Sequence, residues 1–194
     1  MIAIIKYNAG NVESVQNALL RLGATSVVTD HPEQISKADK VIFPGVGEAS
    51  SAMRFLKEKK LDQLIPDLRQ PVLGICLGQQ LMCRNLEEGN VVGMNIFPVD
   101  VKRFPAEDIV PHMGWNSLKN FRNPLFKGVS EDDNVYFVHS YYCENTPFAA
   151  AECDYILPFA AALQKDNFFA TQFHPEKSGK TGAVILQNFL ELNV

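Results

Sequence analysis

The chain has 194 residues and a formal net charge of −4 at pH 7, from 18 basic and 22 acidic residues. This length is sufficient for one domain with a substantial hydrophobic core. The charge balance and the lack of a basic block exclude a strong electrostatic attraction to nucleic acid or to an anionic membrane, so we expect neither partner. No apolar run approaches membrane-spanning length, and the apolar start lacks the basic residues of a secretory leader.

The four cysteines show no C-x-x-C spacing and are too few for a disulfide framework. This usage is typical of a protein of the reducing cytoplasm. No group of cysteine, histidine and carboxylate residues has the spacing of metal ligands. We therefore expect a cytoplasmic protein without a metal site or a cofactor.

Strand and helix patterns alternate at short intervals in the first half of the chain. Strands are expected at 1–6, 26–29, 40–43 and 71–73, and helices at 12–22, 32–37 and 49–56. Gly23 is expected to end the first helix, and Pro66 to end the segment after the third. This alternation predicts an α/β domain with a parallel sheet and helices on both faces.

After residue 90 the pattern changes to short strands joined by Asn, Asp, Pro and Gly turns. These strands are expected around 96–104, 112–118, 134–142, 148–156, 159–164 and 168–173. Asp166-Asn167 resembles a hairpin turn, and a helix over about 180–192 is expected to close over the sheet. No linker, repeat or low-complexity stretch divides the chain, so the sequence predicts one domain.

The segment Gly74-Ile75-Cys76-Leu77-Gly78 follows an apolar run and precedes residues with helical spacing. Strand, sharp turn and helix with this pattern form a nucleophile elbow, in which glycines allow strand and helix to pack closely. We expect Cys76 to have a positive φ and to lie at the helix N-terminus, which favours the thiolate. The Leu77 amide would then point at an oxyanion. The alternative is a buried cysteine at an ordinary turn, and the pentapeptide alone does not separate the two.

An elbow cysteine needs a general base, and His174 is followed by Pro175 and Glu176. Because proline stiffens this segment, His174 can face the sulfur while Glu176 orients the imidazole from behind. The alternative is a capping or core histidine beside a solvated acid. His139 is the rival base, although its apolar surroundings indicate a hydrogen-bonded structural histidine. The other two histidines have no partner in view: His31 and His112.

Two glycine-rich segments resemble phosphate-binding motifs without meeting their patterns. Gly45-Val46-Gly47 follows an expected strand, but a dinucleotide fingerprint requires glycine where the chain has Ser50. Gly179-Lys180-Thr181 resembles the end of a P-loop, but the first glycine of that motif would fall at His174. We expect no nucleotide site at either. The loop 44–47 can still offer backbone N–H groups to an anion, because it follows the carboxyl end of a strand.

Several motifs together resemble the class I glutamine amidotransferases. The elbow segment 74–80 and the segment 172–178, Gln-Phe-His-Pro-Glu-Lys-Ser, carry this resemblance. Three further blocks are similar to the glutaminase subunits of imidazole glycerol phosphate synthases: Pro44-Gly-Val-Gly47, Pro111-His-Met-Gly-Trp-Asn116 and Tyr136-Phe-Val-His-Ser140. The turn 8–11 and Ser14 fit those subunits too. One departure is Gln79, where these elbows usually carry methionine.

The resemblance implies a single domain over residues 1–194 with a mixed, mostly parallel central sheet flanked by helices. It implies that Cys76 is the nucleophile, that His174 is the base and then the acid, and that Glu176 orients the histidine. It further implies an oxyanion hole formed by Val46 and Leu77, and glutamine binding by five residues: Gly45, Gly47, Gln80, Ser140 and Tyr141. Residues 104–110 and 119–134 show little family pattern and receive no role.

The resemblance also implies that L-glutamine is the substrate. Ammonia would pass to a (β/α)8-barrel cyclase subunit, which forms a heterodimer with the chain in histidine biosynthesis. The residues expected to lie toward the barrel are Asn11, Trp115, Tyr136 and Lys177.

Two alternatives are an elbow-cysteine hydrolase that acts alone or serves another synthase, and a glutamine-binding regulatory subunit without turnover. The block 111–116 disfavours the first. The intact Cys76, His174 and Glu176 disfavour the second.

Overall fold

The computed structural model describes residues 1–7 and 11–192, so most of the turn expected at 8–11 lies outside the described residues. The strands are β1 (Ile2–Ile5), β2 (Ser26–Thr29), β3 (Lys40–Phe43), β4 (Val72–Ile75), β5 (Asn85–Leu86), β6 (Val91–Val92), β7 (Asp100–Arg103), β8 (His112–Ser117), β9 (Asn134–His139), β10 (Tyr141–Cys143), β11 (Ala149–Tyr155), β12 (Leu157–Lys165) and β13 (Phe168–Thr171). The α-helices are α1 (Val12–Arg21), α2 (Pro32–Lys37), α3 (Ala49–Glu58), α4 (Leu61–Asp67), α5 (Leu77–Leu81) and α6 (Gly179–Glu191). The 3₁₀ helices are η1 (Glu88–Asn90), η2 (Pro124–Phe126) and η3 (Pro175–Lys177).

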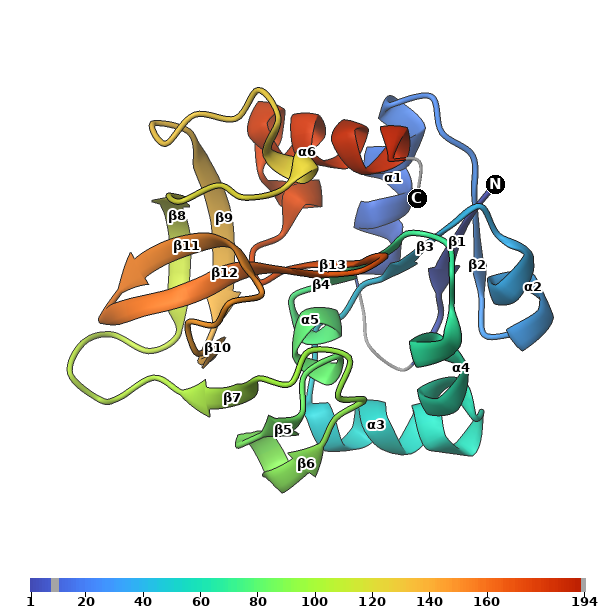
Figure 1. The fold of residues 1–194 in the computed structure, drawn as a ribbon, viewed down its shortest axis with the longest axis horizontal. Helices are drawn as coiled ribbons and strands as arrows, with labels where there is room; N and C mark the ends of the chain where they lie inside the picture. Colours follow the sequence, from blue (N-terminus) through green and yellow to red (C-terminus); the bar gives the residue numbers. More distant parts are fainter. Residues whose placement is uncertain (8–10, 193–194) are drawn as a thin grey trace.

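One long mixed sheet organises the molecule, in the order β2-β1-β3-β4-β13-β12-β10-β7-β5-β6, with β11 paired to β12. From β2 to β13 all neighbours run parallel. From β13 through β12 and β10 to β7 they run antiparallel. β8 and β9 form a separate antiparallel pair at one end of the molecule (Figure 1). The expected α/β fold with a mixed central sheet is confirmed.

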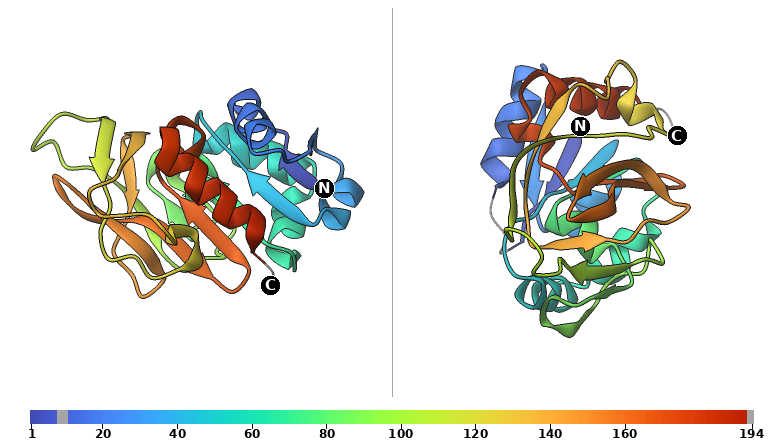
Figure 2. Two further views of the ribbon diagram at one scale, coloured as in Figure 1. Left: turned by 90° about the horizontal axis from the view of Figure 1, so that it is seen from above. Right: turned by 90° about the vertical axis from the view of Figure 1, so that its left-hand side faces the viewer.

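Helices cover both faces of the parallel half of the sheet. Ala3 and Ile5 of β1 face the core shared with α2, α3 and α4, whereas Ile2 and Ile4 face the core shared with α1 and α6. Figure 1 shows α1 and α6 above the sheet and α3 and α4 below it, and Figure 2 shows α1 and α6 side by side over one face. Both faces of these strands are buried because apolar residues occupy both sets of alternate positions.

The expected elements of the first half match the structure closely, including β2, α2 and β3. Gly23 has a φ of 75°, as suits a residue that ends a helix. Pro66 lies inside the last turn of α4 rather than ending it. The helix α3 begins at Ala49 because the Glu48 carboxylate accepts hydrogen bonds from the backbone amides of Ser50 and Ser51.

The second half departs from the expectations at three places. β7 begins only at Asp100, and the two-residue strands β5 and β6 were not predicted. The strand expected over 134–142 is divided at Ser140 into β9 and β10. Asp166-Asn167 is confirmed as a two-residue hairpin turn, since Lys165 pairs with Phe168 across it. Within the described residues, no helix is long and apolar enough to cross a membrane.

The carboxyl ends of three adjacent parallel strands meet at one edge of the sheet. β3 leads into the loop 44–47, β4 leads into Cys76, and β13 leads into the segment with His174 and Glu176. In α/β sheets, ligands bind at this edge because the loops there converge without blocking one another. The fold therefore brings together three segments that are far apart in the sequence.

Candidate active site

Cys76 lies at a strained turn between β4 and α5, with φ 53° and ψ −108°. The prediction of a positive φ is confirmed. A Cβ atom added at Gly78 would overlap the carbonyl oxygen of Phe43, and one added at Gly74 would overlap Met82 and crowd the backbone of α5. Both glycines are therefore needed for the close approach of strand and helix, as an elbow requires.

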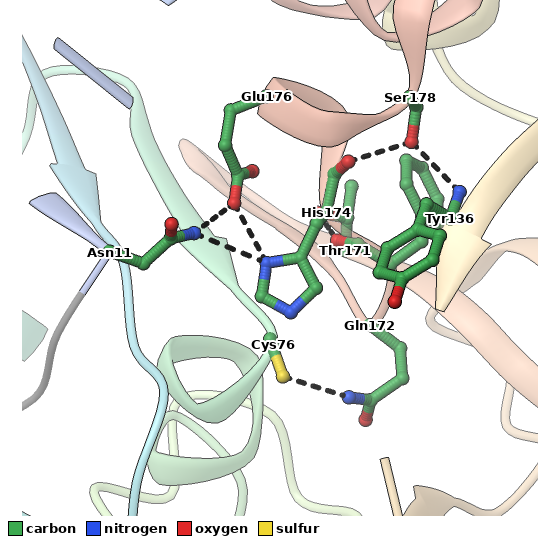
Figure 3. A network of polar contacts seen from close by, with 9 residues as sticks. Asn11, Cys76, Tyr136, Thr171, Gln172, His174, Glu176 and Ser178 are labelled. Atoms are coloured by element: carbon green, nitrogen blue, oxygen red, sulfur yellow. Dashed lines mark hydrogen bonds and ion pairs between the residues drawn. The ribbon is translucent and has the colours of Figure 1, made fainter. Parts of the chain in front are cut away.

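His174 and Glu176 form a buried pair behind the sulfur. The His174 Nδ1 atom lies 2.8 Å from Glu176 Oε1, and both side chains are inaccessible to solvent. Figure 3 shows the imidazole of His174 between Glu176 and Cys76, with its Nε2 edge toward the sulfur. Among the described residues, no side chain or backbone group forms a hydrogen bond with Nε2. This nitrogen is thus available for chemistry at Cys76.

Two polar side chains hold this pair from outside. The Ser178 hydroxyl donates to the carbonyl oxygen of His174 at 2.6 Å and accepts from the backbone amide of Tyr136 at 2.9 Å. Asn11 donates from Nδ2 to Glu176 Oε1, and Nδ2 lies 3.5 Å from His174 Nδ1. Asn11, predicted at a partner surface, is thus in direct contact with the candidate catalytic pair.

The two candidate bases, His174 and His139, have pKa values shifted in opposite directions. Burial opposes a charge on His174, but interactions with Cys76 and Glu176 outweigh it and raise the pKa of His174 to about 10. Burial lowers the pKa of His139 to about 3. The His139 Nδ1 atom lies 2.7 Å from the carbonyl oxygen of Tyr141, and its Nε2 atom lies 2.9 Å from Nδ1 of His112. Both nitrogens of His139 are therefore engaged in structural contacts.

The contact with His139 corrects one expectation. His112 was expected to have no partner, but it pairs with His139 across β8 and β9 and stacks on Tyr155 with ring centroids 3.9 Å apart. Burial lowers the pKa of His112 to about 4. The two histidines form a neutral, hydrogen-bonded pair beneath the site.

The expected oxyanion donors lie next to each other. The backbone amide of Leu77 donates to the carbonyl oxygen of Gly45 at 3.3 Å. A Cβ at Gly45 would collide with the hydroxyl of Tyr7, which itself donates to the carbonyl oxygen of Pro44 at 2.6 Å. Gly47 has a φ of 134°, a conformation that side chains with a Cβ rarely adopt. In this loop conformation, the carbonyl oxygen of Gly45 lies where an oxyanion would need a hydrogen-bond donor.

A pocket of about 340 Å³ opens at Cys76. It is lined by most of the residues predicted to form the oxyanion hole and to bind glutamine: Val46, Gly47, Leu77, Gln80, Ser140 and Tyr141. Gly45 lies beside the pocket rather than in its lining. Four lining residues were not among those predicted to bind glutamine or to form the oxyanion hole: Glu88, Pro111, Val138 and His139. Glu88 adds a carboxylate to the pocket, and burial raises its pKa.

Gln172, which is fully buried, is another residue to which the sequence analysis gave no role. Its Nε2 atom lies 3.6 Å from Cys76 Sγ, and its Oε1 atom lies 3.0 Å from Gln80 Nε2. Because Gln172 lies two residues before His174 at the end of a strand, its position in the motif that signalled the site could have indicated that it lies near Cys76.

The residues expected at a partner surface lie near the His174–Glu176 pair rather than in the lining of the pocket. Trp115 of β8 pairs with Tyr136 of β9, and their rings meet at 5.9 Å edge to face. The backbone of Tyr136 accepts from the amide of His174, and Lys177 follows on the exposed side of η3. Met113 and Trp115 alternate on the outer face of β8 and are 65% and 57% exposed. They form, with Tyr136, a surface that we call the β8–β9 apolar face.

The residues 1–7 and 11–192 contain no group of three or more histidine, cysteine, aspartate and glutamate side chains placed to hold a metal ion. A cysteine at a strained elbow, backed by a histidine–carboxylate pair and open to a pocket, is instead typical of enzymes that transfer acyl groups through a thioester. Fold and site together define this class of protein.

Comparison with known proteins narrows the class. Residues 3–192 match the family model described as "Glutamine amidotransferase class-I". The imidazole glycerol phosphate synthase subunit HisH of Bacteroides fragilis is 61% identical over 194 residues, covering 98% of this chain and 99% of that protein. HisH of Pasteurella multocida is 45% identical and covers 98% of this chain and 97% of its own length. A crystal structure of a putative GMP synthase protein from Thermoplasma acidophilum shares the fold, with a TM-score of 0.76 at 20% identity, over 98% of this chain and 92% of that one.

The chain therefore belongs to the class-I glutamine amidotransferase family, and within it to the group of HisH subunits.

Proposed function

We propose that the chain is the glutaminase subunit of an imidazole glycerol phosphate synthase, in which Cys76, His174 and Glu176 form the catalytic triad. The observation that carries the assignment of the triad is the buried His174–Glu176 pair, joined at 2.8 Å, behind a cysteine with a φ of 53°. The 61% identity to a HisH subunit supports the particular synthase and a role in histidine biosynthesis.

The mechanism follows from the geometry. The Cys76 thiolate attacks the carboxamide carbon of glutamine, and charge develops on the carboxamide oxygen. His174, protonated at Nε2 and held by Glu176 at Nδ1, gives its proton to the departing ammonia, leaving a glutamyl thioester on Cys76. His174 then takes a proton from water, which attacks the thioester and releases glutamate and the thiolate. The raised pKa of His174 supports an imidazolium paired with the thiolate before attack.

The pocket supports an amino acid as substrate. Glu88 provides a carboxylate to which the α-ammonium group of glutamine can bind, and backbone groups near Ser140 and Tyr141 line the other wall. Gln80, Val46 and Gly47 line the same pocket. A glutamine bound to Glu88 by its α-ammonium group would present its carboxamide to Cys76, which lines the same pocket.

The β8–β9 apolar face supports a partner subunit next to the site. Soluble surfaces rarely leave adjacent large side chains such as Met113 and Trp115 so exposed unless they bind another protein. We propose that a (β/α)8-barrel cyclase covers this face together with Asn11 and Lys177. The covered site would pass ammonia to the cyclase without loss to water, where it becomes ammonium. The four free cysteines agree with a cytoplasmic location.

The test is an assay of ammonia and glutamate release from glutamine by the purified chain with a barrel cyclase. Glutamine-dependent release that disappears in His174→Ala, with ammonia-dependent synthesis retained, would support the proposal. Hydrolysis of peptides or esters at higher efficiency than glutamine would indicate a hydrolase of another kind. Glutamine binding without ammonia release in the assembled complex would indicate a regulatory subunit.

A further inference from the structure

Gln172 contacts the reacting sulfur, and neither the triad nor the substrate pocket accounts for it. Its side chain is fully buried at the end of β13, and its Nε2 atom lies 3.6 Å from Cys76 Sγ (Figure 3). Its Oε1 atom lies 3.0 Å from Gln80 Nε2. Gln80 Nε2 in turn lies 3.3 Å from the carbonyl oxygen of Tyr141. A chain of hydrogen bonds thus runs from a backbone carbonyl to the sulfur.

The orientation of the two glutamine amides follows from which atoms can donate and which can accept a hydrogen bond. The Tyr141 carbonyl oxygen only accepts, so the atom of Gln80 that faces it is the amino group. The amino group of Gln80 only donates, so the atom of Gln172 that faces it is the carbonyl oxygen. The other end of the Gln172 carboxamide, which faces Cys76, is therefore its amino group. Turning the amide over would set two amino groups against each other in a buried site.

The Tyr141 carbonyl is itself held in place. His139 Nδ1 lies 2.7 Å from this oxygen, and its Nε2 faces His112, so His139 is fixed as a donor toward Tyr141. The low pKa values of His139 and His112 keep both neutral at the pH at which the enzyme works. The motifs that contain these histidines thus help to orient an amide that ends at the nucleophile.

We propose that Gln172 is a catalytic residue that donates an N–H hydrogen bond to the Cys76 thiolate. A donor in a buried site favours the charged sulfur over the thiol, because hydrogen bonds to ions gain strength where water is excluded. The same bond stabilises the sulfur again when the thioester is hydrolysed and the thiolate leaves. A more stable thiolate is a weaker nucleophile, but nucleophilicity changes less steeply than ionisation, so the net effect at neutral pH is faster reaction.

The proposal rests on the proposed function only for its kinetic part, so it is tested first on the thiol itself. Iodoacetamide alkylation of Cys76, followed by peptide mass spectrometry across pH, reports the thiolate directly. Gln172→Met removes the donor and keeps the side-chain volume. We expect about tenfold slower alkylation at pH 7, with the pH profile displaced upward by about one unit.

Gln79→Met is the matched control. Gln79 is also a fully buried glutamine at the elbow, but its amide donates to Cys143 at 3.3 Å rather than to Cys76. We expect alkylation of Cys76 at the wild-type rate in this variant. Gln172→Glu, which replaces the amino group with an oxygen at the same volume, should slow alkylation further, and it decides the matter if Gln172→Met does not fold. An unchanged pH profile in either folded Gln172 variant would overturn the proposal.

The pH dependence of kcat distinguishes stabilisation of the thiolate by Gln172 from a role of Gln172 in packing alone. If Gln172 stabilises the thiolate, the deficit in kcat of Gln172→Met in the complex with the barrel subunit should shrink as pH rises, because the thiol then ionises without help. A constant deficit at every pH would indicate packing alone and contradict the proposal. If wild-type protein releases no ammonia from glutamine, the proposed function fails, whereas the alkylation series still decides the role of Gln172.

Discussion

The backbone amide of Leu77 donates a hydrogen bond to the carbonyl oxygen of Gly45, with 3.3 Å between nitrogen and oxygen. The amide expected to stabilise the oxyanion is therefore already engaged, and a carbonyl dipole points the wrong way for an anion. Rotation of the Gly45–Val46 peptide would remove the carbonyl and turn the Val46 amide toward the same position. Because Gly47 supplies an adaptable backbone at a φ of 134°, the two loop states can lie within a few kcal/mol of each other.

The chain alone is accordingly expected to bind glutamine but to hydrolyse it slowly. A completed oxyanion hole stabilises the transition state more than the bound substrate, so the barrel subunit should raise kcat about a hundredfold and change KM little. Gly47→Val should suppress this activation, because a β-branched residue restricts the loop. Gly128→Val, at another positive-φ glycine with open space around it, is the control. Steady-state kinetics with and without the barrel subunit check this, and equal kcat values in the two conditions would refute it.

His174 is expected to be the base and acid of the reaction, and His139 a structural residue. His174→Ala should lower kcat for glutamine hydrolysis by about a thousandfold, since it removes both proton transfers. His139→Ala should lower kcat less and also lower the melting temperature, because it leaves His112 without its partner. Mass spectrometry of the glutamyl thioester in each variant checks this. A thioester that forms in His174→Ala but not in His139→Ala would show that the two roles are reversed.

The histidine pair predicts how stability depends on pH. Burial lowers the pKa of His139 to about 3 and that of His112 to about 4, whereas both bind a proton near pH 6.5 in the unfolded chain. Their contribution to stability is therefore complete above pH 6.5 and is lost as pH falls toward 4, by about 1.4 kcal/mol per pH unit for each histidine. Replacing both with phenylalanine should flatten this acid limb in urea unfolding curves. The same slope in the double variant would show that other groups cause it.

The β8–β9 apolar face is expected to bind the barrel subunit. Trp115→Ala should weaken the complex about tenfold or more, because a large exposed aromatic that becomes buried typically dominates an interface. Val92→Ala changes another exposed apolar residue, on β6, and should leave the affinity unchanged. Titration calorimetry of each variant with the barrel subunit measures the effect. Equal affinities for wild type and Trp115→Ala would place the interface elsewhere.

The elbow and the alternation of strands and helices could be predicted because their signals are local. Glycines on both sides of Cys76, and an apolar run before them, indicate a strand-to-helix turn from the local sequence, and the further motifs of the chain favoured an elbow there. The same holds for the hairpin at Asp166-Asn167. By contrast, β5 and β6 have two residues each, which is too short to show any alternation. Their pairing depends on the neighbouring β7.

Contacts between distant segments could not be predicted from the sequence. The pairing of His112 with His139 joins residues 27 positions apart and depends on the register of β8 and β9. The contact of Gln172 with Cys76 depends on β13 lying beside β4. The expected strand over 134–142 is divided because β9 pairs with β8, whereas β10 pairs with β7 and β12 of the main sheet. In each case tertiary register, rather than local pattern, decides the partner.

The most direct test of the account is the pair of activities of Cys76→Ala in the complex with the barrel subunit. The sulfur of Cys76 forms the proposed thioester, but Cys76 takes no part in the reaction of the barrel subunit with ammonia. Glutamine-dependent synthesis should be lost, while synthesis from added ammonia should proceed at the wild-type rate. Retention of glutamine-dependent synthesis, or loss of both activities in a complex that still assembles, would contradict the account.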